Sequence, residues 1–137
     1  HYLSPSTGVI AAEPEGADDA KLSFESGTLT SSEKPRTIAD GLLTSLGEKT
    51  FEIIKRYVND IVTVDDEAII NATCVIFERM KIVIEPSAAV PLAAILEKRL
   101  DVQGLSVGII LSGGNINVSG LETSIIPKDT KSELNNY

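Results

Sequence analysis

Three short runs of apolar residues along the chain predict buried β-strands. The first covers residues 8–12 and the second residues 61–64. The third, residues 106–111, is continuously apolar, as expected for a strand that is covered on both faces of a parallel sheet. Polar or turn-forming residues follow each run. The pattern therefore predicts separate strands, each ending where polar chemistry begins.

Between these runs, apolar side chains recur at helical spacing. Residues 18–26 predict a short helix that ends at Gly27, and residues 49–58 predict a second helix. The strongest helical pattern follows Asp65 and Asp66, whose carboxylates suit a helix N-terminus. Its apolar face consists of Ile69, Ile70, Thr73, Ile76, Phe77 and Met80.

A further helix is predicted from Pro86, which suits the first helical position, to Leu100. Pro91 conflicts with this prediction, because a proline inside a helix costs about 3 kcal/mol. We therefore expect a kink at Pro91 or a helix that begins later. Residues 28–36 are rich in Ser, Thr and Pro and predict a loop. The polar residues 127–137 predict a flexible tail.

Strands that alternate with helices predict an α/β fold, with a mostly parallel sheet flanked by helices. Ligands of such sheets bind beyond the carboxyl ends of the strands. This rule makes the residues that follow Ala12 and Leu111 the first candidates for a functional site.

The net charge and the cysteine content exclude some classes of partner. The 137 residues include 12 basic and 20 acidic ones, which gives a net charge of −8. Such a surface repels nucleic acid and anionic membranes, so neither is an expected partner. No run approaches the roughly 20 apolar residues of a membrane span. The single cysteine, Cys74, cannot form an internal disulfide, which favours a reducing, cytoplasmic location.

Ser112, Gly113, Gly114 and Asn115 follow the third predicted strand. A small hydroxyl and two glycines at a strand end allow a flat ligand to approach the backbone. The same residues also fit an ordinary tight turn. The pattern alone leaves both interpretations open.

Residues 13–19 carry four carboxylates within seven residues, directly after the first predicted strand. Hard cations prefer carboxylate and carbonyl oxygens, so a divalent cation could bind there, although a solvated acidic loop is the alternative. Glu85, between two predicted helices, suits an acid, a base or a hydrogen-bond anchor, or simply a helix N-terminal charge. Asp40 and Gly41 are similarly ambiguous.

Five groups of residues, in this order along the chain, resemble the serine racemase and serine/threonine dehydratase family, together with the hydroxyaspartate dehydratases. The resemblance runs from about Gly8 to Asn117. The groups are Ala11-Ala12-Glu13-Pro14 with Ala17-Asp18-Asp19, Thr37-Ile38-Ala39-Asp40-Gly41, Asp60-Ile61-Val62-Thr63-Val64, Glu78-Arg79-Met80-Lys81 leading to Glu85-Pro86-Ser87, and Leu111-Ser112-Gly113-Gly114-Asn115.

The resemblance implies the architecture of a fold type II enzyme that uses pyridoxal 5′-phosphate. Residues 1–126 would form the C-terminal part of its large domain. The family's Schiff-base lysine, small domain and glycine-rich phosphate loop would all lie upstream, and this chain contains no Gly-Gly-Gly-Gly run. We therefore assign no catalytic residue to this chain. The implied partners are the N-terminal half of the same enzyme and a second copy, in a homodimer.

The resemblance also assigns cofactor contacts. It implies that Ser112 faces the pyridine nitrogen of the cofactor and that Glu85 lies close to the ring. Asp40 and Gly41 match a segment that passes near the cofactor. Gly113 and Asn115 belong to the same turn as Ser112 and complete the predicted set.

Two further sites are implied by the resemblance. Glu13, Asp19 and the carbonyl of Ala17 match a site for magnesium, calcium or manganese. Arg79 and Lys81 match positions that contact ATP in the racemases that ATP activates. ATP is therefore expected as an effector, not as a substrate.

The implied substrate is a small β-hydroxy amino acid, from which the upstream lysine removes the α-proton. Dehydratases then lose the β-hydroxyl and release a keto acid and ammonia, whereas racemases return a proton to the opposite face. Ser87-Ala88-Ala89 replaces the Thr-Ala-Gly expected in racemases, Asn117 replaces a usual acidic residue, and Pro91 replaces a small or apolar one. These departures leave the two activities open.

Two alternatives belong to other classes of protein. The chain could be a noncatalytic fragment or subunit that binds a divalent metal and a partner chain, because unpaired strand edges seek pairing with another chain. An ordinary nucleotide-binding domain is disfavoured, because the chain contains no G-x-G-x-x-G motif.

Overall fold

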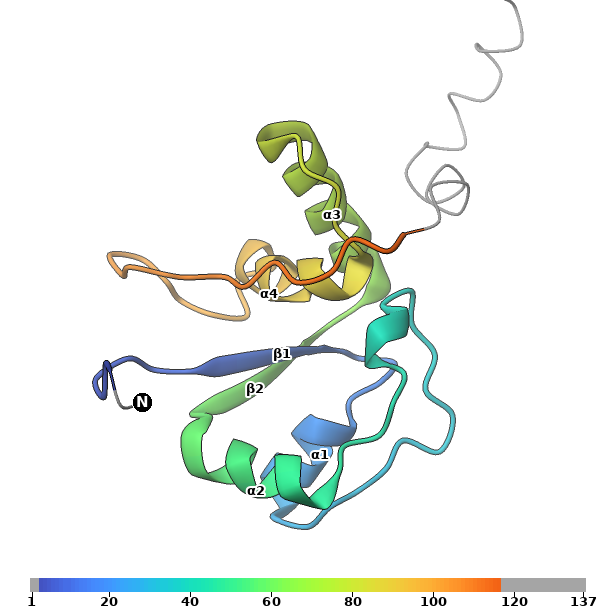
Figure 1. Ribbon diagram of the computed structural model, residues 1–137, viewed down its shortest axis with the longest axis vertical. Helices are drawn as coiled ribbons and strands as arrows, with labels where there is room; N and C mark the ends of the chain where they lie inside the picture. Colours follow the sequence, from blue (N-terminus) through green and yellow to red (C-terminus); the bar gives the residue numbers. More distant parts are fainter. Residues whose placement is uncertain (1–2, 117–137) are drawn as a thin grey trace, which may run out of the picture.

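The computed structural model describes residues 3–116, so Asn117 and the predicted tail at residues 127–137 lie outside the described residues. Two strands lie between two layers of helices, with α1 and α2 on one side and α3 and α4 on the other (Figure 1). The elements are β1 (Ile10–Pro14), α1 (Asp19–Ser26), the 3₁₀ helix η1 (Asp40–Leu42), α2 (Glu48–Tyr57), β2 (Asp60–Val64), α3 (Asp66–Met80) and α4 (Pro86–Leu96). This arrangement confirms the predicted α/β class.

The two strands pair in parallel, with Ile10 opposite Asp60 and Pro14 opposite Val64. Asn59 continues the pairing beyond the strands, because its side-chain oxygen accepts from the N–H of Val9 and its own N–H donates to the Val9 carbonyl, both at 2.8 Å. Parallel pairing brings the carboxyl ends of both strands to one edge of the sheet. The acidic turn after β1 and the start of α3 after β2 therefore lie at the same edge.

The helix α3 follows β2 directly and begins as its sequence predicts. Asp65 is its N-cap, and the carboxylate accepts from the N–H of Ala68 at 2.8 Å. Ile69 and Ile76 on its inner face are almost fully buried. The helix ends at Lys81, which adopts the left-handed conformation with φ of 60°.

The helix α4 packs closely because its buried face is made of small residues. Ala88, Ala89, Ala93 and Ala94 are at most 2% exposed, and together with α3 and Val64 of β2 they form the main hydrophobic core. Small side chains allow the helix backbone to approach the strands and α3 closely. The close packing determines where the first residues of α4 lie.

The structure confirms the predicted start of α4 and corrects its predicted end. The helix begins at Pro86 and continues through Pro91, so the alternative of a late start is wrong. It ends at Leu96 and not at Leu100. Lys98 adopts the left-handed conformation (φ 55°), and the N–H groups of Lys98 and Arg99 donate to the carbonyls of Ile95 and Ala94. This hydrogen-bond pattern is a Schellman motif, which usually contains glycine and is therefore hard to recognise when lysine occupies the position.

The predicted strand at residues 106–111 does not form in the described chain. The segment runs beside α4 without strand or helix structure (Figure 1), and Val107 and Ile110 are 50% and 84% exposed. The reason is that a strand requires a hydrogen-bonded neighbour, and within residues 3–116 β1 pairs only with β2. The other two predicted strands, the loop at residues 28–36 and the glycine that ends α1 are confirmed.

Among residues 3–116, no helix combines the length and apolar character that crossing a bilayer requires.

Candidate functional site

Two segments that are distant in the sequence meet where α4 begins. Gly41, in η1, donates its N–H to the hydroxyl of Ser87 at 3.1 Å. A Cβ atom at Gly41 would lie 2.9 Å from that hydroxyl oxygen and 3.4 Å from a carboxylate oxygen of Glu85. Glycine is the residue that allows η1 to approach the start of α4 this closely.

A third segment, the turn after residue 111, also contacts Glu85. The N–H of Glu85 donates to the carbonyl of Gly113 at 3.4 Å. Gly113 has a φ of +77°, and a Cβ atom there would overlap the carboxyl group of Glu85. Gly114 is also close, since a Cβ at this position would lie 3.2 Å from the carbonyl oxygen of Val83. Both the backbone conformation and the lack of space therefore require glycine at position 113.

We call Gly41, Glu85, Ser87 and Gly113 the glycine–glutamate cluster. Three of its members were predicted from the sequence, whereas Ser87 was missed as a site residue. A signal for Ser87 existed, because Pro86 at the first helical position places residue 87 in the first turn of α4. The other predicted cofactor residues, Asp40, Ser112 and Asn115, are neighbours of the cluster in the chain, and all three are exposed.

The chemistry of the glycine–glutamate cluster suits binding more than bond-making. It offers a partly buried carboxylate, a serine hydroxyl, and two glycines whose backbone packs closely against these two side chains. The exposed hydroxyl of Ser112 adds a second donor or acceptor next to Gly113. These groups can form hydrogen bonds with the polar atoms of a ligand.

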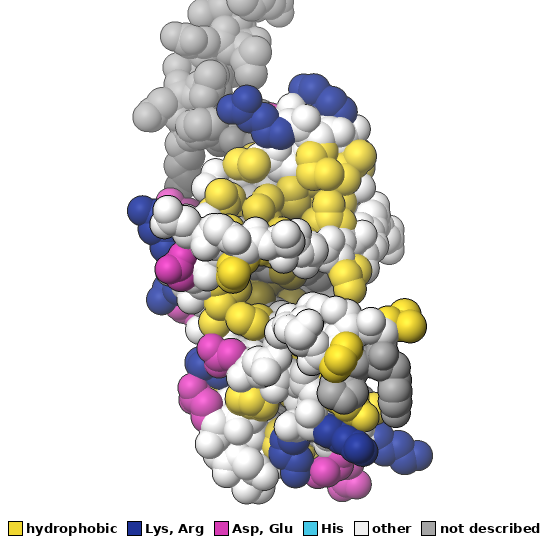
Figure 2. Space-filling model, turned by 90° about the vertical axis from the view of Figure 1, so that its left-hand side faces the viewer, with side chains coloured by type: hydrophobic (Ala, Val, Ile, Leu, Met, Phe, Trp, Pro, Cys, Tyr) yellow, Lys and Arg dark blue, Asp and Glu magenta, His cyan; other side chains and the backbone are white. Residues whose placement is uncertain are grey.

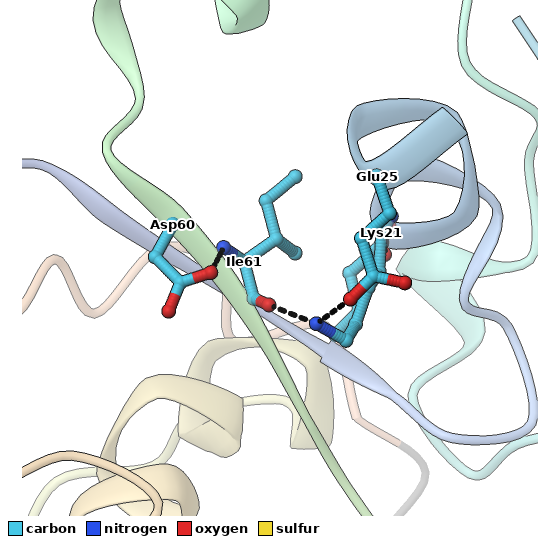
Figure 3. A network of polar contacts seen from close by, with 5 residues as sticks. Lys21, Glu25, Asp60 and Ile61 are labelled. Atoms are coloured by element: carbon cyan, nitrogen blue, oxygen red, sulfur yellow. Dashed lines mark hydrogen bonds and ion pairs between the residues drawn. The ribbon is translucent and has the colours of Figure 1, made fainter. Parts of the chain in front are cut away.

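Lys21 is engaged in structural contacts. Its ammonium group donates to the carbonyl of Ile61 in β2 at 2.9 Å and pairs with Glu25 at 2.7 Å (Figure 3). The contact with Ile61 attaches α1 to β2, whereas the ion pair with Glu25 lies within α1. The Lys21 side chain therefore stabilises the fold.

The three predicted cation ligands lie at and beside the turn between β1 and α1: Glu13 is in β1, Ala17 is in the turn, and Asp19 is the first residue of α1. Ala17 and Asp19 are 1% and 4% exposed, and Glu13 is partly buried. The N–H of Lys21 donates to Glu13 at 2.9 Å, and the N–H of Leu46 donates to Asp19 at 2.7 Å. Within residues 3–116, no group of three or more Asp, Glu, His or Cys side chains could hold a metal ion. A cation at this turn would therefore depend on the Ala17 carbonyl and on water.

The carboxyl group of Glu13 is perturbed by its surroundings. Its pKa is raised from 4.5 to about 7, chiefly by burial and with a contribution from the negative charges of Asp19 and Asp18, against the opposing effect of the N–H groups of Lys21 and Ala20. Asp19 thus lies close enough to Glu13 for its negative charge to act on the Glu13 carboxyl group. A bound cation would relieve this repulsion.

Arg79 and Lys81, the predicted nucleotide contacts, lie at the C-terminal end of α3, and both are exposed. In the described part of the chain, neither forms an ion pair. Their long cationic side chains are therefore free to meet an anion, but no described contact connects them to the glycine–glutamate cluster.

Comparison with known proteins identifies the family. Residues 1–113 match the family model described as "Pyridoxal-phosphate dependent enzyme". The chain therefore belongs to the family of pyridoxal-phosphate dependent enzymes.

The similar proteins include both dehydratases and racemases. The chain is 45% identical over 119 residues to β-hydroxyaspartate dehydratase of Paracoccus denitrificans, and 47% identical over 123 residues to serine racemase of Dictyostelium discoideum. Each match covers 87% of this chain but only 38% of the relative. The solved structure of a threonine deaminase from T.th. matches with a TM-score of 0.77 and 48% identity, covering 85% of this chain and 43% of that protein. The chain thus spans about two fifths of the length of these relatives.

Gly113→Ala tests whether the contact between Gly113 and Glu85 matters for the cofactor. The matched control is Gly104→Ala, because Gly104 has a similar φ of +76° but no neighbouring atom within 4 Å. Both variants should lose about 1 kcal/mol of unfolding free energy from backbone strain, as measured by urea denaturation, and Gly113→Ala should lose more because its methyl group overlaps the Glu85 carboxyl group. Only Gly113→Ala should weaken binding of pyridoxal phosphate, because its methyl group displaces the Glu85 carboxylate. Equal cofactor affinity in the two variants would contradict this assignment.

Glu13 should make stability depend on pH. Because the folded state holds the Glu13 proton up to about pH 7 and the unfolded chain releases it near pH 4.5, stability should be full below pH 4.5 and fall as the pH rises to 7. Glu13→Gln, whose side chain stays uncharged, should remove this fall in stability with rising pH. The measurement is the difference in unfolding free energy between the two proteins, in chelator, from pH 4 to 8. A difference that does not change with pH would show that the pKa of Glu13 is ordinary.

Proposed function

We propose that this chain is the C-terminal part of a pyridoxal-phosphate dependent ammonia-lyase or racemase that acts on a small β-hydroxy amino acid. The observation that carries the proposal is the meeting of Gly41, Glu85 and Gly113 from three distant segments, in a chain that belongs to this family. The similarity to dehydratases and racemases supports the choice of reaction.

The glycine–glutamate cluster suits the pyridine ring of the cofactor because the close approach of Gly41 and Gly113 to Glu85 brings a carboxylate and the Ser87 hydroxyl beside the segment that carries Ser112. When bound, pyridoxal phosphate supplies an electron sink that stabilises negative charge at the substrate's α-carbon. In this proposal Ser112 offers its hydroxyl to the pyridine nitrogen, and Glu85 lies near the ring. A neutral hydroxyl does not force protonation of that nitrogen, so the cofactor is a weaker electron sink than it would be with a carboxylate facing the nitrogen. Loss of a β-hydroxyl group, which needs less stabilisation of charge than transamination, suits such a site.

The described surface supports the upstream half of the same enzyme as the partner. An open groove of about 730 Å³ lies between residues 6–12, α4 and residues 99–109. Hydrophobic side chains gather on this face, several of them in the hollow that crosses it (Figure 2). Ile10 on β1 and Leu105 and Val107 across the groove are 47%, 66% and 50% exposed. A strand of the upstream half, inserted into this groove, could pair with the free edge of β1 and with residues 106–111. It would also cover these apolar side chains.

The homodimer and ATP as an effector stay predictions of the resemblance, and the cytoplasmic location stays a prediction from the single cysteine.

The first test uses this chain alone and the assembled protein, by which we mean this chain together with the upstream half. After incubation with pyridoxal phosphate and borohydride, the assembled protein should carry one reduced adduct on an upstream lysine, and should deaminate or racemise a β-hydroxy amino acid. The chain alone should do neither. A stoichiometric adduct on a lysine of this chain would refute the proposal. Assembly without any cofactor binding would favour a noncatalytic subunit.

We also propose that Glu13, Asp19 and the Ala17 carbonyl bind one divalent cation, with water completing about six oxygen ligands. The support is the proximity of two carboxylates in a turn whose charge repulsion a cation would relieve. Such a cation would stabilise the turn and take no part in proton transfer.

Saturating magnesium or calcium should therefore raise the melting temperature of the assembled protein. Asp19→Asn should abolish this shift, because it removes a proposed ligand charge. Asp18→Asn is the matched control, since Asp18 is the neighbouring carboxylate outside the proposed ligand set, and the shift should persist. The assignment fails if wild type shows no shift or if the shift survives in Asp19→Asn.

A further inference from the structure

One side chain of α3 holds the segment that carries Gly41 into the glycine–glutamate cluster. One carboxylate oxygen of Asp66 accepts from the hydroxyl of Thr37 at 2.5 Å, and the other accepts from the N–H of Ile38 at 3.2 Å. The Thr37 hydroxyl also accepts from the N–H of Ala39 at 3.1 Å. Three consecutive residues are thus attached to one carboxylate, directly or through the Thr37 hydroxyl.

The neighbouring aspartate leaves Asp66 free for this contact. Asp65 is the N-cap of α3 and accepts from the N–H of Ala68. Asp66 is the first residue of the helix, where the helix dipole favours a negative charge, and both of its oxygens are directed at the segment before η1. Hydrogen bonds to an ionised carboxylate are roughly twice as strong as those between neutral groups.

The same segment is anchored again at its other end. Ala39 is completely buried, and its carbonyl accepts from the N–H of Leu42 at 2.9 Å. Two residues after Ala39, the N–H of Gly41 donates to Ser87. Loss of the Asp66 contacts would leave the approach of Gly41 to Glu85 dependent on the Ser87 contact and on the burial of Ala39.

We infer that Asp66 is a positioning residue for the cofactor site: through Thr37 and Ile38, it sets the position of Asp40 and Gly41 beside Glu85. The inference rests on the proposed function, because it states that this position matters for binding pyridoxal phosphate. Asp66 acts through the loop and not on the cofactor.

The test measures two quantities in the assembled protein. Hydrogen–deuterium exchange of residues 37–43, without cofactor, reports the position of the loop. Titration with pyridoxal phosphate, followed by its fluorescence, reports cofactor affinity. Asp66→Asn keeps one acceptor oxygen but places an N–H₂ group opposite a hydrogen-bond donor, so one of the two contacts is lost. Exchange at residues 37–43 should become about tenfold faster, and the affinity for pyridoxal phosphate should become about tenfold weaker.

Two control variants separate positioning from general stability. Asp65→Ala removes the helix cap, so it should lower the melting temperature and speed exchange in the first turn of α3. It should leave exchange at residues 37–43 and cofactor affinity as in wild type. Asp66→Glu retains two carboxylate oxygens and should restore slow exchange and affinity.

Three outcomes would overturn the inference, each in a recognisable way. Unchanged exchange at residues 37–43 in Asp66→Asn would show that Asp66 does not hold the loop. Faster exchange with unchanged cofactor affinity would show that the position of the loop is irrelevant to the site. An assembled wild-type protein that binds no pyridoxal phosphate would refute the proposed function, and the positioning role with it.

Discussion

The close packing of α4 against α3 and the strands is the constraint on which the rest of the chain depends. Its alanine face lets the helix backbone lie close to β2 and α3, with almost no exposed surface at Ala89, Ala93 and Ala94. Because the helix is held at this position, its first residues project Glu85 and Ser87 toward η1 and the turn at Gly113. A larger side chain on this face would displace the helix and separate the segments that form the glycine–glutamate cluster.

The acidic residues at the sheet edge have different roles, although they are close neighbours in the chain. Asp65 caps α3, whereas Asp66 holds the loop before η1. Asp19 receives the N–H of Leu46, and Glu13 receives the N–H of Lys21. Each carboxylate thus compensates backbone groups that helices and strands leave unpaired, which ties the connecting loops to the two-stranded sheet. The candidate cation turn and the loop that carries Gly41 are attached to the same framework.

Local sequence signals predicted the elements whose ends depend on a few residues. Gly27 ends α1, Asp65 begins α3 and Pro86 begins α4, because each effect acts within one helical turn. The prediction failed where a neighbour decides the outcome. Residues 106–111 have the composition of a buried strand, yet a strand exists only when another strand supplies its hydrogen bonds. The end of α4 at Leu96 was missed because a lysine occupies the left-handed position of its Schellman motif.

The sequence by itself determined the α/β class, the family to which the chain belongs, and the residue types of the candidate site. The α/β class follows from the periodicity of the apolar residues, and the family and the residue types follow from motifs in a fixed order. Both signals can be read without knowing any distance between residues. Only the tertiary structure decided that Gly41, Glu85 and Gly113 meet, that Ser87 joins them, and that Asp66 holds the loop while Asp65 caps the helix. These contacts join residues up to 46 positions apart, as from Gly41 to Ser87, and Glu85 contacts both Gly41 and Gly113. Their geometry depends on how closely α4 packs, which no local pattern specifies.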